Sequence, residues 1–144
     1  MWLVDPSTSS GQVAKYINTP ESPLYHKSSV LFGIDRAHKS MREKNRVVLV
    51  EGYFDVLACH RVGVTEAIAT CGTALTDDHV AVLKRSVDRV VLCLDQDNAG
   101  KAAAERGFIA CAKEGLQVEG IVLADKDPAD AAVTSRDELK ELLV

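Results

Sequence analysis

Hydrophobic residues in this chain gather in short unbroken runs that alternate with segments of helical periodicity. Residues 47–50 and 90–94 are wholly apolar, and residues 65–70 and 118–123 each carry a further apolar stretch. Strands of a parallel sheet are covered on both faces, so they read as continuous apolar runs. The pattern therefore predicts four strands, the third of which starts at Arg89.

Helical spacing and helix-ending residues fill the segments between these runs. The four helices expected after the strands cover residues 52–62, 76–87, 98–114 and 135–143. Thr76 is an N-cap residue type, and Gly63 and Gly115 follow two of these helices as C-cap glycines. A further helix is predicted upstream, from about Ser29 to beyond Met41. Strands that alternate with helices predict a compact, Rossmann-like α/β fold with about four parallel strands flanked by helices.

Carboxylates follow two of the predicted strands. Glu51 comes directly after the first strand, and Asp95 and Asp97 come after the third. The carboxyl ends of parallel strands meet at one edge of the sheet, where α/β proteins bind their ligands. Asp95 and Asp97 leave the same face if the chain stays extended, so they could grip one ion together. Neighbouring carboxylates repel one another, so the cluster predicts a bound divalent cation, Mg²⁺. Glu51 would be a further ligand or an acid/base.

Two common phosphate-binding motifs are missing from the sequence. No GxGxxG follows the first strand and no GxxxxGK[ST] follows any strand, so a dinucleotide site or a P-loop is not indicated. A bridging divalent ion at the carboxylates would handle phosphate instead. The four cysteines form no CxxC pair and lie in or beside apolar stretches, which predicts buried reduced thiols and no zinc site.

Length and charge bound the organisation of the chain. Its 144 residues suit one domain, and a net charge of −4 argues against extensive phosphate-backbone binding, so any nucleic-acid contact must be local or metal-mediated. Residues 13–45 are nevertheless rich in Lys and Arg. Residues 1–12 resemble neither a signal peptide nor a membrane span and are expected to be a flexible lead or a vector-derived remnant. We expect a cytoplasmic protein without membrane contact.

Several motifs in order resemble one known family. Glu51-Gly52 and the Asp-x-Asp-x-Ala-Gly run that begins at Asp95 are similar to the TOPRIM domain of primases, topoisomerases and some nucleases. The upstream segment 15–21, the His26-Lys27 pair and the later 126–128 segment, Lys-Asp-Pro, narrow the resemblance to bacterial DnaG-type DNA primases. The resemblance covers about residues 13–143. It implies a division into the lead at 1–12, the end of a basic subdomain at 13–45, and a TOPRIM catalytic domain at 46–144.

The resemblance also implies roles for individual residues. Glu51, Asp95 and Asp97 match the catalytic metal centre of these primases, and Asp127 matches an acid that adds to the same metal site. Asp55 matches a further acid of the family. Two basic residues, Lys15 and Lys27, match positions that contact the template or the incoming nucleotide.

The implied activity is that of a DNA primase catalytic core. Such an enzyme is a nucleotidyltransferase with DNA-directed RNA polymerase activity, which makes RNA primers for DNA replication. It uses Mg²⁺, for which Mn²⁺ can substitute, and its partners are single-stranded template DNA, nucleoside triphosphates and the replicative helicase. The helicase contact belongs to regions that this chain lacks, and the fragment by itself could be inactive.

Two departures from the family pattern keep alternatives open. Gln96 lies between the two aspartates where the family often has glycine, and the acid after Asp127-Pro128 is displaced by one position, to Asp130. One alternative is a TOPRIM nuclease or topoisomerase part, in which Glu51 assists strand cleavage. Another is a non-catalytic metal-binding scaffold in replication or recombination.

Overall fold

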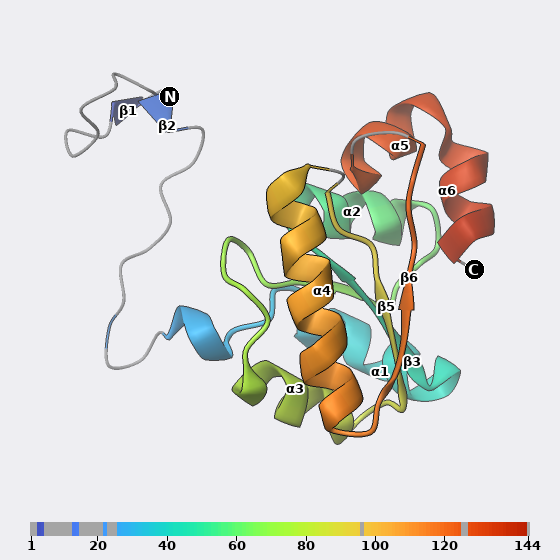
Figure 1. The fold of residues 1–144 in the computed structure, drawn as a ribbon. Coiled ribbons are helices and arrows are strands. Elements are labelled where there is room, and N and C mark those ends of the chain that lie inside the picture. The colour runs from blue at the N-terminus through green and yellow to red at the C-terminus, as the bar shows by residue number, and fades with distance from the viewer. Residues whose placement is uncertain are drawn as a thin grey trace.

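A four-stranded parallel sheet forms the centre of the molecule in the computed structural model (Figure 1). The structure describes residues 3–4, 13–14, 22, 26–95, 97–124 and 127–143. The strands of this sheet are β3 (Arg46–Val50), β4 (Ala67–Ala69), β5 (Arg89–Leu92) and β6 (Gln117–Gly120), in the order β4-β3-β5-β6. The predicted α/β class and the four parallel strands are confirmed.

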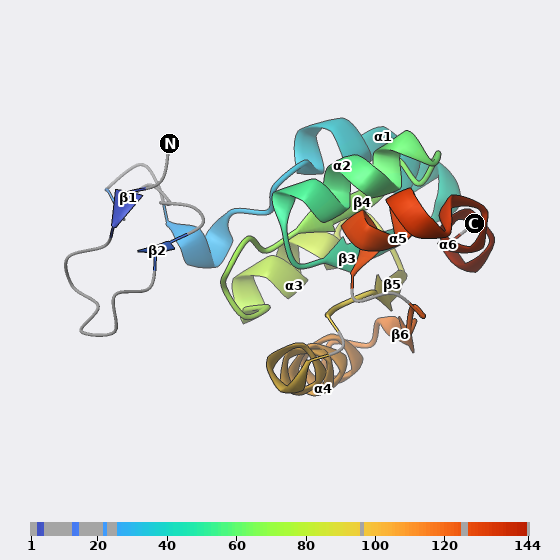
Figure 2. The same cartoon turned by 90° about the horizontal axis from the view of Figure 1, so that it is seen from above.

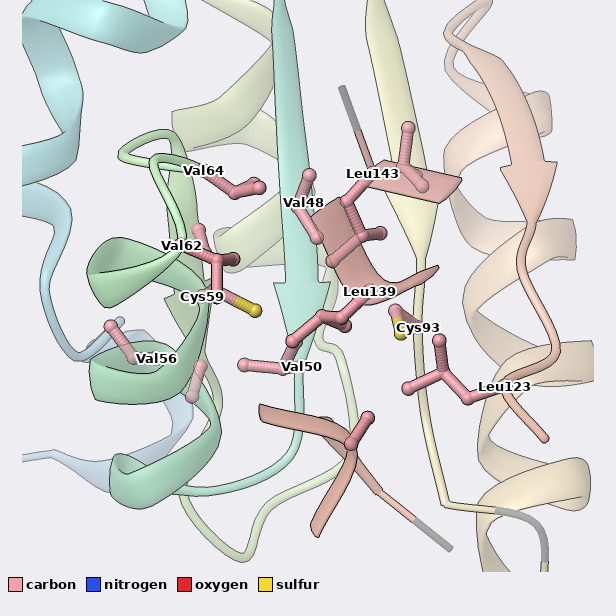
Figure 3. Packing of buried hydrophobic residues seen from close by; sticks show 14 residues of the cluster. Val48, Val50, Val56, Cys59, Val62, Val64, Cys93, Leu123, Leu139 and Leu143 are labelled. Carbon is pink, nitrogen blue, oxygen red and sulfur yellow. The ribbon is translucent and has the colours of Figure 1, made fainter. Parts of the chain in front are cut away.

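Alternate residues of each central strand face two separate cores. Val48 and Val50 of β3 join one buried cluster, while Val47 and Leu49 join the other. The first cluster lies under the helices α2 (Tyr53–Arg61), α5 (Pro128–Thr134) and α6 (Arg136–Leu143). Figure 3 shows Leu139 of α6 over β3 in this cluster. Continuous valine runs thus form β3 and β5 because both of their faces are covered.

The second core lies under α1 (Ile34–Lys44), α3 (Asp77–Lys84) and α4 (Asn98–Lys113). Figure 2 shows α4 packed beside β5 and β6, with α5 and α6 across the sheet from it. Thr76 caps α3 as predicted, because its hydroxyl accepts a hydrogen bond from the backbone N–H of His79 at 3.2 Å. Gly63 and Gly115 adopt positive φ angles of 97° and 82° just beyond α2 and α4, as expected of C-cap glycines.

The upstream helix begins later than the sequence predicts. Residues Lys27–Ser29 form a single 3₁₀ turn, η1, and α1 starts only at Ile34, after Gly33 with a φ of 83°. Between them, Phe32 pairs with Ala69 of β4 through two backbone hydrogen bonds of 2.8 and 3.1 Å. Those bonds occupy the N–H and C=O of Phe32, so this stretch cannot also belong to a helix.

Helix α5 was not predicted, although its start is recognisable. Asp127 is its N-cap and Pro128 its first residue, a favoured combination because proline has no N–H to leave unpaired there. The predicted last helix is confirmed as α6, with Leu139 and Leu143 buried. The Glu138 side chain that completes its expected capping box lies outside the described residues.

Three further features concern the N-terminal strands, the cysteines and the suitability of the helices for crossing a membrane. Near the N-terminus, β1 (Leu3–Val4) and β2 (Val13–Ala14) pair antiparallel. All four cysteines are free, but only three are buried; Cys71 is half-buried, so its predicted burial is wrong in degree. Among the helices described, none combines the length and the apolar character that a membrane crossing demands.

Candidate metal centre

The carboxyl ends of β3 and β5 lie side by side and are tied together by a side chain. Leu49 pairs with Leu92 in the sheet, and Glu51 follows two residues after Leu49. The Oε1 atom of Glu51 accepts a hydrogen bond from the backbone N–H of Asp95 at 3.1 Å. The structure therefore brings together two of the predicted metal ligands, as the parallel sheet requires.

Asp97 lies close by but has a second task. It is the N-cap of α4, and its Oδ1 accepts a hydrogen bond from the backbone N–H of Gly100 at 2.7 Å. A Cβ on Gly100 would lie 2.2 Å from the carbonyl oxygen of Asp95 and 2.9 Å from Oε1 of Glu51. Only glycine lets the first turn of α4 approach the strand end so closely, and this turn brings Asp97 and the positive end of the helix dipole to the site.

Burial and neighbouring negative charges raise the pKa of two acids at this edge, Glu51 and Asp55. The pKa of Glu51 is raised, first by burial and then by the negative charges of Asp95, Asp97 and Asp55, although the Asp95 N–H counters part of the effect. The pKa of Asp55 is also raised by burial and by the charges of Asp127 and Asp95, against two backbone hydrogen bonds. Ion pairs among the described residues include neither Glu51 nor Asp55. A cation bound beside Glu51 and Asp55 would therefore offset their negative charge.

Asp127 and Asp55 connect this cluster to α5. Asp127 caps α5 by accepting a hydrogen bond from the Asp130 N–H at 2.8 Å. Asp55 is buried, with 8% of its surface exposed, and accepts hydrogen bonds from the N–H groups of Gly52 at 2.9 Å and Ala129 at 3.2 Å. Asp130, the displaced acid, is exposed in the first turn of α5.

Two hollows meet at Glu51. One, of about 310 Å³, is lined by Glu51, Asp55, Asp95 and Cys71 among others, and this is the acidic pocket. The other, of about 240 Å³, lies between the sheet and α4, and Arg106 is the basic residue in its lining. Glu51 lines both hollows, so it is placed to act on a group bound in the acidic pocket.

The side chains are of the types that bind a hard divalent cation, but those that the structure describes are not arranged around one point. Among the residues the structure describes, no three His, Cys, Asp or Glu side chains converge as a ready-made metal site. Glu51 and Asp97 each commit one carboxylate oxygen to a backbone N–H. A carboxylate has a second oxygen that can coordinate a hard divalent cation such as Mg²⁺, Mn²⁺ or Ca²⁺. The acids thus share one edge, and side-chain rotation would have to bring them onto one ion.

Some of the predicted residues lie in parts of the chain that the structure does not describe. Lys15 and Gln96 lie outside the described residues, and so does the side chain of Lys27. Sequence reasoning named Asp55 only as a match to a further acid of the family, and it missed Arg106. Asp55 is at the third position of α2, where an acid pairs with the N-cap N–H, and that spacing was a readable signal. Arg106 follows Ala99 and Ala103 on one face of α4, the face that lines the second hollow.

Known proteins share this fold and these motifs. The Toprim-like family matches residues 48–132, and the DNA primase catalytic core, N-terminal domain, matches residues 7–38. The DNA primase of Streptomyces coelicolor is 44% identical over 130 residues, which are 86% of this chain and 20% of that protein. The chain spans about one fifth of the length of the curated relatives it matches.

Solved structures agree with the sequence relatives. The zinc-binding and RNA polymerase domains of Aquifex aeolicus primase superimpose with a TM-score of 0.83 at 32% identity, over 90% of this chain and 33% of that one. The DnaG primase catalytic domain bound to ssDNA gives a TM-score of 0.78 at 34% identity, over 90% and 42% of the two chains. Toprim domains of primases imply the use of a divalent metal in general. The chain belongs to the Toprim-like family, and within it to the Toprim domains of bacterial DnaG-type DNA primases.

Proposed function

We propose that this chain is part of the catalytic core of a DNA primase, which joins nucleoside triphosphates into RNA primers by Mg²⁺-dependent nucleotidyl transfer. The observation that carries the proposal is the acidic cluster at the carboxyl edge of the sheet, where Glu51 is hydrogen-bonded to the strand end that bears Asp95 and Asp97. The primase relatives support the same assignment. The acids occupy the edge at which an α/β sheet binds its ligand.

Each acid has a role in this proposal. Asp95, Asp97 and Asp127 are metal ligands, and Glu51 is a ligand or an acid/base beside the reacting oxygen. The bound Mg²⁺ supplies positive charge that offsets the charge developing on the transferred phosphoryl group. Glu51 is held at the end of β5 by the Asp95 N–H, where it would hold the metal, and the N-terminus of α4 adds a favourable field for phosphate at Asp97.

The partners follow from the same assignment. Single-stranded DNA is the template and nucleoside triphosphates are the substrates; a primase relative bound to ssDNA supports the first. Lys15 and Lys27 contact the nucleic acid or nucleotide, because an acidic site of this kind needs basic neighbours to hold a polyanion. The replicative helicase binds through other regions of the full-length protein, which acts in the cytoplasm.

The division of the chain is also a proposal. Residues 1–12 form a lead, 13–45 the end of a basic subdomain, and 46–144 the TOPRIM catalytic domain. The two family matches, at residues 7–38 and 48–132, support a change of module near residue 45. The lead and the first match overlap at residues 7–12, so the first boundary has less support than the second.

One observation favours a second candidate function. Oε1 of Glu51 is already bonded to the Asp95 N–H, and a non-catalytic metal-binding scaffold for replication or recombination partners would tolerate this use because it needs no acid/base. The two functions differ in the role of Glu51, because a scaffold needs its charge only to hold a metal. They agree in needing the acidic cluster for cation binding.

Calorimetric titration of Mg²⁺ and Mn²⁺ into the chain tests the metal centre. The Asp95→Ala/Asp97→Ala double variant should lose measurable binding. A matched control, Asp77→Ala/Asp78→Ala, removes two acids from the first turn of α3, away from the site, and should bind as the unchanged chain does. Unchanged binding in the first variant would refute the metal assignment.

A primer-synthesis assay separates the enzyme from the scaffold. With this domain in its full-length protein, Glu51→Gln should abolish synthesis while preserving the Asp95 N–H bond, since the amide oxygen still accepts it. The same variant should leave template binding in place. Retained synthesis would remove Glu51 from the mechanism, whereas a full-length protein that makes no primers even with Glu51 in place would favour the scaffold.

A further inference from the structure

We propose that Asp55 is a positioning residue that clamps the Glu51-Gly52 loop to the first turn of α5 and so sets the distance between Glu51 and Asp127. The inference deepens the proposed function and rests on it for the importance of that distance. It assigns Asp55 to the frame of the acidic pocket and gives it no part in binding the metal.

Both oxygens of Asp55 are already used. Oδ2 accepts a hydrogen bond from the N–H of Gly52 at 2.9 Å, and Oδ1 accepts one from the N–H of Ala129 at 3.2 Å, from a residue 74 positions further along the chain. The residue is only 8% exposed. Each oxygen keeps a second lone pair, but the two bonds fix the orientation of the carboxylate. Asp55 could turn toward a metal only by losing one of them, and a buried N–H left without an acceptor is costly.

The first turn of α5 needs the carboxylate that Asp55 provides. The first N–H groups of a helix have no partner inside it. Pro128 has no N–H, the Asp130 N–H is bound by Asp127, and the Ala129 N–H is bound by Asp55. Asp55 therefore completes the capping of a helix that is distant in sequence.

The loop after β3 depends on the same carboxylate. Gly52 is the N-cap of α2 and has no side chain with which to fix the turn, so its N–H is held by Asp55 from the third position of the helix. Glu51 precedes Gly52, and Asp127 precedes Pro128 and Ala129. One buried carboxylate thus fixes the two backbone segments that carry these acids.

Asp55→Asn tests the clamp because asparagine keeps the shape but has one acceptor oxygen instead of two. In the metal-free chain, one of the Gly52 and Ala129 amides should exchange with solvent about ten- to a hundredfold faster, the range expected for losing a hydrogen bond to a charged acceptor. Thr76→Ala is the matched control, since it removes a cap from α3 outside the acidic pocket. It should leave both amides unchanged; equal exchange in Asp55→Asn and the unchanged chain would overturn the proposal.

Bound Mn²⁺ gives a readout that a loss of stability alone would not move. In the unchanged chain, Mn²⁺ should broaden the NMR signals of residues near Asp95 and of those near Asp127 alike. In Asp55→Asn the broadening near Asp95 should stay and that near Asp127 should fall, because α5 is no longer held. Loss of Mn²⁺ binding with normal amide exchange would make Asp55 a ligand and overturn the proposal.

A measurement on the unchanged chain covers the case in which Asp55→Asn does not fold. A scalar coupling across the hydrogen bond, from the Ala129 amide nitrogen to the Asp55 carboxyl carbon, should be detectable without metal. Its absence from a chain whose other backbone couplings are seen would refute the clamp. Both metal-free measurements are independent of primase activity, whereas failure of the proposed function would show in the Mg²⁺ titration of the unchanged chain.

Discussion

The carboxylates at the two ends of the parallel sheet have opposite surroundings. At the amino end, Glu66 is fully buried just before β4 and is met by Lys44 at 2.9 Å and Arg46 at 2.7 Å. At the carboxyl end, Glu51 and Asp55 are surrounded by further acids and by backbone N–H groups. Within the described part of the chain, Glu66 is thus paired with two cations, whereas no ion pair includes Glu51 or Asp55.

The pKa values of Glu66 and Glu51, one at each end, differ accordingly. Burial pushes the pKa of Glu66 upward, but hydrogen bonds from Lys44, the backbone and Arg46 outweigh it and leave the pKa lowered. Burial and repulsion together raise the pKa of Glu51. A buried charge is stable only with a partner, and the two cations supply one to Glu66. In the proposed function, a bound metal ion would supply the partner of Glu51.

Breaking the amino end should cost the most stability. Glu66→Ala leaves Arg46, whose side chain is 12% exposed, as an unpaired charge, and we expect a loss of about 3–5 kcal/mol in the free energy of unfolding. Urea denaturation measures it. The control is Glu114→Ala, which removes a pair with Lys84 that is about half exposed on both sides and should cost less than about 1 kcal/mol. Equal losses would mean that Glu66 is not compensated in the way described.

Gly100→Ala should break the carboxyl end sterically. The added Cβ would lie 2.2 Å from the Asp95 carbonyl, which is backbone and cannot step aside, so we expect a loss of about 1–3 kcal/mol. Gly107→Ala, on the same helix, would meet only Leu92 and Leu75 side chains at 3.6 Å or more and should gain about 0.5–1 kcal/mol from helix propensity. Thermal and urea unfolding of both variants give the comparison, and similar effects would contradict it.

Asp97 allows the fold and the charge to be separated. Asp97→Ala removes the cap of α4 and should cost about 1 kcal/mol, whereas Asp97→Asn keeps an N-cap residue and should cost only a fraction of that. Both variants should weaken Mg²⁺ binding, because both remove the carboxylate. Denaturation and metal titration on the same samples measure the two effects. Normal Mg²⁺ affinity in Asp97→Asn would restrict Asp97 to capping.

The smallest effect should be seen in the pH dependence of the metal-free chain. Glu51 and Asp55 have raised pKa values, so the stability they contribute is full below their ordinary values of 4.5 and 3.8 and is lost as the pH rises through the raised ones. Glu66 has a lowered pKa, so its contribution is present above 4.5 and is lost as the pH falls through the lowered value.

Urea unfolding from pH 7 down to pH 4 in a chelator separates these two contributions. Glu51→Gln should stabilise the metal-free chain at pH 7 by up to roughly 1 kcal/mol, the size of one like-charge contact near water. The gain should shrink on acidification, because Glu51 is then protonated in the unchanged chain as well. A gain that stays constant down to pH 4 would mean that repulsion at Glu51 is not its cause.

Much of the fold could be predicted because local and tertiary signals agree. The valine runs of β3 and β5 are buried on both faces, and α4 starts and ends where Asn98 and Gly115 indicate. The start of α1 could not be predicted, since Phe32 is drawn from a helical pattern into pairing with Ala69, a contact distant in sequence. Strand β6 is short, lies at the edge of the sheet and is mostly exposed. Its sequence therefore lacks the continuous apolar run that marks β3 and β5.

The site could be predicted in part for a similar reason. That Glu51 and Asp95 meet follows from parallel strands and needs no structure. That Asp97 turns to cap α4 did not follow, because an aspartate before a helix has a local use that competes with metal binding. The bond from the Ala129 N–H to Asp55 joins residues 74 positions apart, and no local pattern shows it.

The bond from the Gly100 N–H to Asp97 limits how the chain can vary in length. It spans the fixed three-residue step of a helix cap, while Gly100 also rests against the Asp95 carbonyl. A residue inserted or deleted between positions 95 and 100 would break both contacts at once. Surface loops tolerate such changes, so length variation in proteins of this plan should fall in loops such as the one between α3 and β5 and spare this six-residue stretch.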